Sequence, residues 1–128
     1  MRVLICGDRH WADDASIRWH LQQLHEQYPD LEVIEGGATG ADSIAGEIAR
    51  EMGLTVYEYP AKWATYGKAA GPVRNAEMLV DGKPDLVLAF HDNLSTSRGT
   101  RDMVQRARKA GVPVEVIGEN KPPVFGQP

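Results

Sequence analysis

The chain has 128 residues, of which 42% are hydrophobic and 25% are charged, and its formal net charge is −4. This size and composition predict one globular domain with a buried core, and the apolar runs are too short to make a membrane a partner. The mild acidity argues against a dedicated nucleic-acid partner. Cys6 is the only cysteine, and the N-terminal run shows no signal-peptide cleavage pattern. We therefore expect no internal disulfide and a cytoplasmic location.

Short apolar runs alternate with amphipathic stretches along the chain. The apolar runs predict strands at residues 2–6, 31–34, 54–59, 85–90 and 112–117. The first amphipathic stretch predicts a helix that Asp13 or Asp14 begins and Pro29 ends. Further helices are expected from residue 41 to a stop at Gly53, at 72–80 and at 100–111. Residues 60–70 show neither pattern and are expected to be irregular.

Strict alternation of strands and helices predicts an α/β domain over residues 1–118, with a five-strand parallel sheet between two helical layers. Ligands of such sheets bind at the carboxyl ends of the strands, where the strand order reverses. Residues 119–128 are rich in proline and are expected to form a loosely ordered tail.

A glycine-rich turn separates the second predicted strand from the second predicted helix. It runs Gly36-Gly37-Ala38-Thr39-Gly40-Ala41-Asp42. A glycine turn that opens a helix presents backbone N–H groups and the positive end of the helix dipole, which suits a phosphate. The alternative is that Thr39 caps the helix, with Asp42 completing a capping box, and that the glycines serve only a tight turn.

Three segments should meet at the carboxyl edge of the sheet, because each follows a strand. They are residues 7–11, 36–42 and 91–100. The last contains Ser97-Arg98-Gly99-Thr100, a second turn of small residues that leads into a helix. Two helix starts that can bind an anion and Arg9 are thus expected at the same edge of the sheet. This combination favours a ligand site over turns that serve the fold alone.

Each candidate side chain has a structural alternative. Arg9 can clamp a phosphate bidentately, or pair with Asp8 or Asp13. Arg74 and Asn75 can point to the same edge, or lie on a solvated helix face. An aromatic pair in the irregular stretch, Trp63 and Tyr66, can stack on a base or fill the core under the loop.

The chain shows no pattern for a metal or a cofactor. The four histidines lack metal-ligand spacing. Cys6 ends an apolar run and is expected to be a buried small hydrophobe. We therefore predict neither a metal nor a cofactor.

Four ordered motifs resemble the YspA/cpYpsA-related branch of the SLOG superfamily: Gly7-Asp8-Arg9, residues 36–42, residues 66–75 and residues 97–100. The resemblance implies a Rossmann-like domain that binds a nucleotide or a nucleotide-derived small molecule as a sensor or carrier. The residues expected to bind it are Gly7, Arg9, Gly36, Gly37, Ala38, Thr39, Gly40, Ala41, Asp42, Gly71, Arg74, Asn75, Ser97, Arg98, Gly99 and Thr100.

The superfamily also includes the LOG phosphoribohydrolases, which gives an alternative function. These enzymes cleave a nucleoside monophosphate with an arginine in M-x-x-R-K and a glutamate in P-G-G-x-G-T-x-x-E. By position, Arg74 corresponds to that arginine and Asp102 to that glutamate, although Asp102 is shorter by one methylene. If the chain is an N-glycosidic hydrolase, Arg74 and Asp102 are therefore its expected catalytic residues.

Two further expectations concern larger partners. The resemblance also implies a relationship to the DNA-handling protein DprA, which gives DNA handling as a third hypothesis. It ranks last because of the net charge and because the sequence shows no basic stripe. A homodimer is expected from the dimers of the superfamily and from apolar residues beyond a simple helical stripe, namely Met78, Leu79 and Met103.

Overall fold

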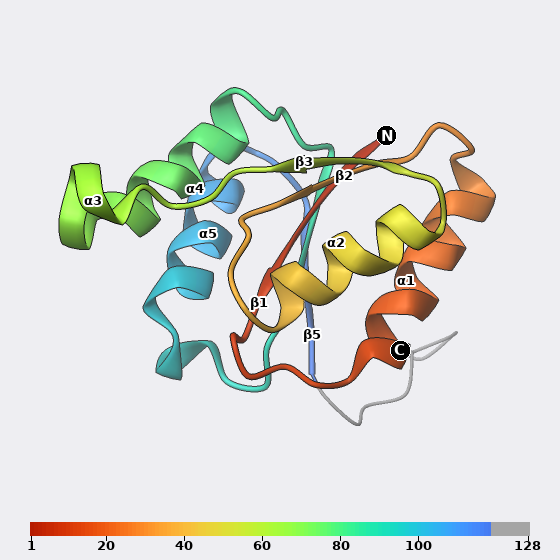
Figure 1. Cartoon of the computed structure of the whole chain (residues 1–128), viewed down its shortest axis with the longest axis horizontal. Coiled ribbons are helices and arrows are strands. Elements are labelled where there is room, and N and C mark those ends of the chain that lie inside the picture. The colour runs from red at the N-terminus through yellow and green to blue at the C-terminus, as the bar shows by residue number, and fades with distance from the viewer. Residues whose placement is uncertain (119–128) are drawn as a thin grey trace.

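A computed structural model of the chain describes residues 1–118 and shows one parallel sheet (Figure 1). Its five strands lie in the order β3-β2-β1-β4-β5, and every neighbouring pair is parallel. The strands are β1 (Arg2–Gly7), β2 (Glu32–Glu35), β3 (Thr55–Glu58), β4 (Leu86–Phe90) and β5 (Val114–Ile117). The predicted α/β class and the five-strand parallel sheet are confirmed. The expectation of a loosely ordered tail at 119–128 lies outside the described residues.

A longer helix lies in each of the four connections between consecutive strands, and short helical turns interrupt two of the loops. The longer ones are α1 (Asp14–Gln27), α2 (Ala41–Glu51), α4 (Ala70–Val80) and α5 (Arg98–Lys109). The short ones are α3 (Trp63–Tyr66) and the 3-10 turns η1 (Gly67–Ala69) and η2 (Leu94–Thr96). Two predicted starts were wrong by two residues, because α4 begins at Ala70 and α5 at Arg98. None of the helices within residues 1–118 is both long and apolar enough to cross a lipid bilayer.

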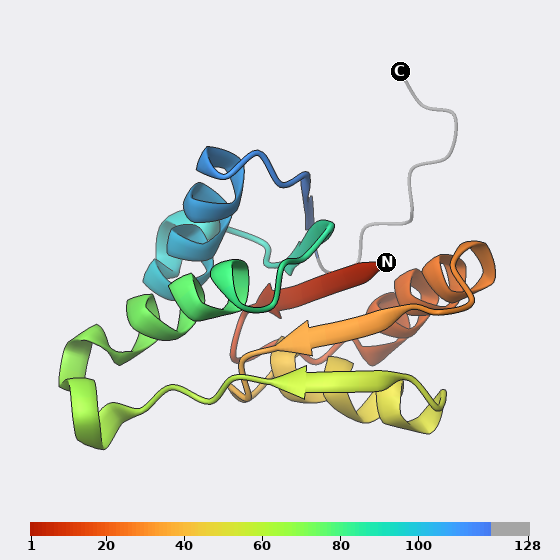
Figure 2. The ribbon, with the colours of Figure 1, turned by 90° about the horizontal axis from the view of Figure 1, so that it is seen from above.

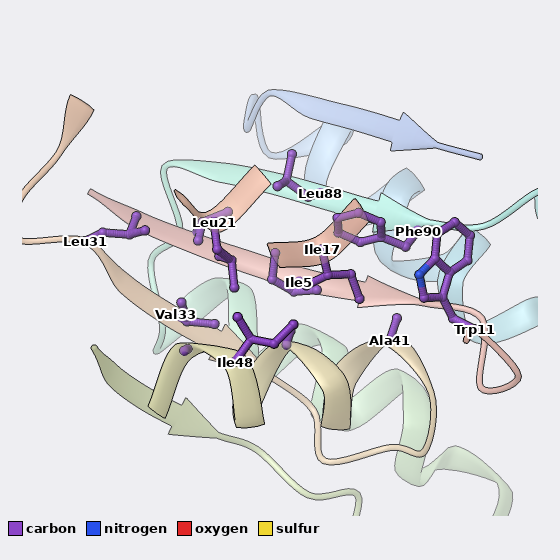
Figure 3. Packing of buried hydrophobic residues seen from close by; sticks show 13 residues of the cluster. Ile5, Trp11, Ile17, Leu21, Leu31, Val33, Ala41, Ile48, Leu88 and Phe90 are labelled. Atoms are coloured by element: carbon purple, nitrogen blue, oxygen red, sulfur yellow. The ribbon is translucent and has the colours of Figure 1, made fainter. Parts of the chain in front are cut away.

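The helices form two layers, one on each face of the sheet (Figure 2). Side chains alternate along β1, so that Val3 and Ile5 face α1 and α2, whereas Leu4 and Cys6 face α4 and α5. Figure 3 shows the first of these cores, in which Ile17 and Leu21 of α1 pack against β1 and β4. This amphipathic spacing of α1 was correctly predicted.

The second core contains the apolar residues that suggested a dimer. Met78 and Met103 are buried at 1% and 0% exposure, and Leu79 packs against the same cluster. Met78 and Met103 therefore stabilise the core of the monomer and are not available for a dimer surface, and Leu79 is half-buried beside them. Self-association stays a prediction that rests on the superfamily alone.

The strand order reverses between β1 and β4. From β1 the chain adds β2 and β3 on one side, and then returns to add β4 and β5 on the other. The loops that leave β1 and β4 therefore diverge at the carboxyl edge, which is where open α/β sheets bind ligands. A hydrogen bond from the Asp8 N–H to the Phe90 carbonyl, 2.9 Å long, fixes the base of this opening.

Candidate functional site

The loops that follow β1 and β2 touch at Gly40. A Cβ atom at this position would lie 2.3 Å from the Asp8 carbonyl oxygen and 2.4 Å from the Arg9 carbonyl carbon. Gly40 also has a φ of +80°, a conformation that L side chains rarely adopt. Next to it, the Ala41 N–H donates to the Asp8 carbonyl over 3.1 Å. Two of the predicted segments are thus held together by backbone contact that requires glycine.

Arg74 of α4 reaches across to the glycine turn. Its Nη1 donates to the Gly36 carbonyl over 2.7 Å, and its Nε donates to Asn75 Oδ1 over 3.0 Å. Asn75 is only 3% exposed. The alternative of a solvated helix face for these two residues is therefore wrong, and α4 is joined to the carboxyl edge through them.

The first two N–H groups of the glycine turn, those of Gly36 and Gly37, already have acceptors within the chain. Asp42 Oδ2 accepts the Gly36 N–H at 3.0 Å, and Glu35 Oε1 accepts the Gly37 N–H at 3.0 Å. Both acids are buried, at 5% and 1% exposure. Two carboxyl groups of the protein thus accept the hydrogen bonds that a bound anion accepts in other glycine turns.

The capping-box interpretation of this turn is wrong. The residue before α2 is Gly40 rather than Thr39, and no side chain caps the helix. The Asp42 carboxylate points back to Gly36 instead. A Cβ atom on Gly36 would lie 2.3 Å from Arg74 Nη1 and 2.8 Å from Asp42 Oδ2, so Gly36 is held between the two charged side chains.

Burial changes the protonation of these acids. Desolvation, reinforced by the nearby Asp42 and Glu58 carboxylates, raises the pKa of Glu35 to about 8. Desolvation also raises the pKa of Asp42 to about 6, against the opposing effect of the Arg74 guanidinium. At neutral pH, Glu35 is therefore mostly protonated and Asp42 mostly ionised beside Arg74. Burial also raises the pKa of the Cys6 thiol, which fits the predicted buried hydrophobe rather than a reactive thiol.

Asp102 belongs to a hydrogen-bonded chain that joins α4 to α5. Asn75 Nδ2 donates to Asp102 Oδ2 over 3.0 Å and to the Gly99 carbonyl over 3.2 Å. Arg106 Nε donates to the same Asp102 oxygen over 2.8 Å. Arg74 and Asp102 are thus linked through Asn75, each held by partners within the chain.

The turn before α5 differs, because two of its backbone donors have no acceptor in the part of the chain that the structure describes. Ser97 caps the helix, and its Oγ accepts the Thr100 N–H at 3.2 Å. Within residues 1–118, the N–H groups of Arg98 and Gly99 donate to no protein acceptor, as is usual for the first turn of a helix. Both residues are exposed.

Arg9 is also exposed, and no ion pair within residues 1–118 includes it. Asp8 Oδ1 accepts the His10 N–H, and Asp13 Oδ1 accepts the Ser16 N–H. The alternative of an ion pair between Arg9 and either aspartate is therefore wrong. The Arg9 guanidinium is free to meet an anion.

The irregular stretch forms an arm between β3 and α4 that projects from the body (Figures 1 and 2). Trp63 and Tyr66 lie on it at 61% and 43% exposure. The interpretation that they fill the core is wrong, and stacking on a base stays a prediction. Gly71, the first glycine of α4, faces this arm, since a Cβ atom there would lie 3.8 Å from Trp63 Cη2.

Sequence reasoning did not select Glu35, Arg106 or His91 as site residues, although His91 begins the 91–100 segment that was placed at this edge. Glu35 ends an apolar run directly before the glycine turn, and a charged residue in that position was the available signal. His91 is 6% exposed, and its Nδ1 accepts the Asn93 N–H at 3.0 Å, which shapes the loop after β4. No group of three or more His, Cys, Asp or Glu side chains within residues 1–118 is arranged to hold a metal ion.

Comparison with known proteins agrees with this architecture. Residues 1–66, from β1 to α3, match the YspA, cpYpsA-related SLOG family. The chain belongs to this family. It is also 42% identical over 125 residues to the Gene 61 protein of Mycobacterium phage D29, an alignment that covers 92% of this chain and 97% of that protein. The family match contains the glycine turn, whereas α4 and α5 of this SLOG protein lie beyond it.

Proposed function

We propose that this SLOG protein binds a nucleotide or a nucleotide-derived small molecule at the carboxyl edge of its sheet, as a sensor or carrier that does not turn the ligand over. The observation that carries the proposal is the arrangement at the reversal of strand order. There the N–H groups at the start of α5 and the guanidinium groups of Arg9 and Arg98 follow neighbouring strands, and none of them has a partner among residues 1–118. Backbone donors and arginines together are the usual means of binding a phosphate.

We favour the start of α5 as the position that binds the phosphate. Its N–H groups at Arg98 and Gly99 donate to no acceptor in the described part of the chain, whereas those of Gly36 and Gly37 already donate to buried acids. The glycine turn contributes the wall of the site, and Arg74 stabilises that wall from α4. Gly40 and Ala41 of the turn, which touch the loop after β1, complete the same rim.

An N-glycosidic hydrolase is the second candidate, because Asn75 links Arg74 to Asp102. Hydrolysis needs a carboxylate that can engage the ribose as positive charge develops. The same Asp102 oxygen, Oδ2, accepts from both Asn75 and Arg106. Binding without turnover requires no release of these bonds, and we therefore favour it.

Titration calorimetry with a panel of nucleoside monophosphates, NAD and ADP-ribose tests the proposal. We expect at least one member to bind, and Arg98→Gln or Arg9→Gln to weaken its affinity about tenfold or more, which is about 1.4 kcal/mol. Lys83→Gln removes an exposed charge from the opposite edge of the sheet and is the matched control. Failure of every ligand to bind, or an equal loss with Lys83→Gln, would contradict the site.

Chromatography of the same mixtures separates the two candidates. A binding protein releases no free base after prolonged incubation. Release of base that Asp102→Asn abolishes, while ligand binding is retained, would establish the hydrolase instead.

A further inference from the structure

The outward face of α5 is strongly basic. The helix contains five of the 14 Lys and Arg residues of the chain and one of its 18 acidic residues. Its buried side consists of Thr100, Met103, Val104 and Ala107. At 3.6 residues per turn, the opposite side presents a stripe, called here the α5 stripe, that consists of Arg98, Arg101, Gln105, Arg108 and Lys109.

No carboxylate within residues 1–118 forms an ion pair with a cation of the α5 stripe. The fifth cation of the helix, Arg106, forms an ion pair with Asp102 at 2.8 Å, but it lies beside the stripe. Arg101 Nη1 donates to the uncharged Ser95 carbonyl over 3.3 Å. Within residues 1–118, no ion pair includes Arg98, Arg108 or Lys109, and all three are exposed.

The helix dipole explains only part of this pattern. Cations in the last turn of a helix are stabilised by the negative end of the dipole, which accounts for Arg108 and Lys109. Arg98 and Arg101 lie near the positive end, where a cation is disfavoured, and the first turn contains no acid. Stability therefore does not account for a stripe whose cations lie at both ends of α5, with the neutral Gln105 between them.

We propose that the α5 stripe binds the phosphate backbone of a polynucleotide. A helix of 12 residues is about 18 Å long, which spans about five successive phosphates of one DNA strand. Three of the four cations of the stripe are arginines, whose planar guanidinium groups match phosphate geometry. An acidic protein partner fits less well, because every apolar side chain of α5 is buried, and the stripe offers none of the apolar anchors on which protein interfaces depend.

This inference goes beyond the proposed function and corrects the sequence analysis, which found no basic stripe. The helix was predicted to begin at Thr100, so Arg98 was placed in a loop. In the structure α5 begins at Arg98, and the helical repeat aligns Arg98 with Arg101, Arg108 and Lys109. The acidic residues that set the net charge lie elsewhere in the chain.

Fluorescence anisotropy with labelled 20-nucleotide single-stranded DNA, duplex DNA and RNA tests the stripe at 50 and 200 mM salt. We expect dissociation constants of about 1–100 µM near physiological salt, with binding that weakens steeply as salt rises. The variant Arg108→Gln/Lys109→Gln removes two cations far from the small-ligand site. It should weaken binding several-fold at 50 mM salt and reduce the slope of log K against log salt by about 1.4–1.8. Circular dichroism verifies that the variant is folded.

The control Arg50→Gln/Lys83→Gln removes the same charge from exposed positions outside α5 and should leave binding unchanged. An equal loss in the control, or no binding by the unmodified protein, would overturn the proposal. Tighter binding of poly-glutamate than of every nucleic acid would assign the stripe to an acidic protein instead. Full displacement of DNA by a mononucleotide, with no effect of Arg108→Gln/Lys109→Gln, would place the contact in the small-ligand site. The stripe and the proposed function can therefore fail separately.

Discussion

Two turns open helices at the same edge of this sheet, and they use their backbone donors in opposite ways. The turn before α2 donates the N–H groups of Gly36 and Gly37 to buried acids of the protein itself. The turn before α5 leaves the N–H groups of Arg98 and Gly99 without an acceptor among the described residues 1–118. Glycine content alone therefore does not identify an anion site. The side chains that surround the turn decide whether its donors are free.

The largest expected effect concerns the contact between the loops after β1 and β2. Gly40→Ala places a Cβ atom 2.3 Å from a backbone oxygen and at positive φ, so neither the new atom nor its neighbour can move cheaply. We expect the free energy of unfolding to fall by about 4 kcal/mol or more, measured by urea denaturation. Gly53→Ala is the matched control, because Gly53 has a φ of +76° but open space around it. Gly53→Ala should lower the free energy of unfolding by about 1–2 kcal/mol. Equal losses in the two variants would mean that the loop contact is unimportant.

The next largest effect comes from removing the side chain that accepts a backbone N–H in each of the two turns. Asp42→Ala leaves the buried Gly36 N–H without its acceptor and Arg74 without its nearby anion. We expect a loss of about 2–4 kcal/mol in unfolding free energy. Ser97→Ala removes only the cap of α5 and should cost about 1 kcal/mol. A smaller loss for Asp42→Ala than for Ser97→Ala would contradict the view that the first turn is built around an internal carboxylate.

The pH dependence of stability provides a third test. The pKa of Glu35 is about 8 in the folded protein and near 4.5 in the unfolded chain, so the folded state binds more protons between these values. Stability should therefore fall as pH rises from about 5 to 8, and Asp42, whose pKa is raised to about 6, adds to this fall at the acidic end.

Glu35→Gln should flatten this dependence, because the amide keeps an acceptor for the Gly37 N–H but does not titrate. Urea denaturation at pH 5, 6.5 and 8 measures the slope. Glu47→Gln changes an exposed carboxyl of α2 and serves as the control. It should show the same pH dependence of stability as the unmodified protein. An unchanged slope in Glu35→Gln would show that Glu35 is ionised in the folded state.

The smallest effect concerns the second turn. Nothing lies within 4 Å of a Cβ atom built on Gly99, and the residue is already helical. Gly99→Ala should therefore stabilise the protein by up to about 1 kcal/mol, seen as a small rise in Tm. A clear loss of stability would show that this turn is as crowded as the one before α2.

Much of the fold followed from local pattern. The apolar runs and amphipathic stretches predicted every strand of the sheet and the four longer helices, because hydrophobic periodicity and turn residues act over a few turns of chain. The exact ends were less predictable. Gly71 and Pro72 fall inside the first turn of α4, and Arg98 inside α5, because tertiary packing extends a helix beyond its local signals.

For the candidate site, sequence order predicted which segments gather at the carboxyl edge, because parallel strands place their ends together. It did not predict that Asp42 faces Gly36 or that Asn75 holds Asp102 across two helices. The arm residues Trp63 and Tyr66 show the same limit, because composition did not distinguish a buried aromatic from one exposed on a projecting loop.

Short-range hydrophobic patterns within each segment determine the order of strands and helices. That order in turn gives the parallel sheet and its carboxyl edge. Which donors at that edge are free depends on groups far apart in the chain, such as Arg74 and Gly36, which are separated by 38 positions. Hydrogen bonds and burial between such groups exist only once the helices pack on the sheet. The chemistry of the two turns therefore diverges in the folded protein, although both are rich in small residues.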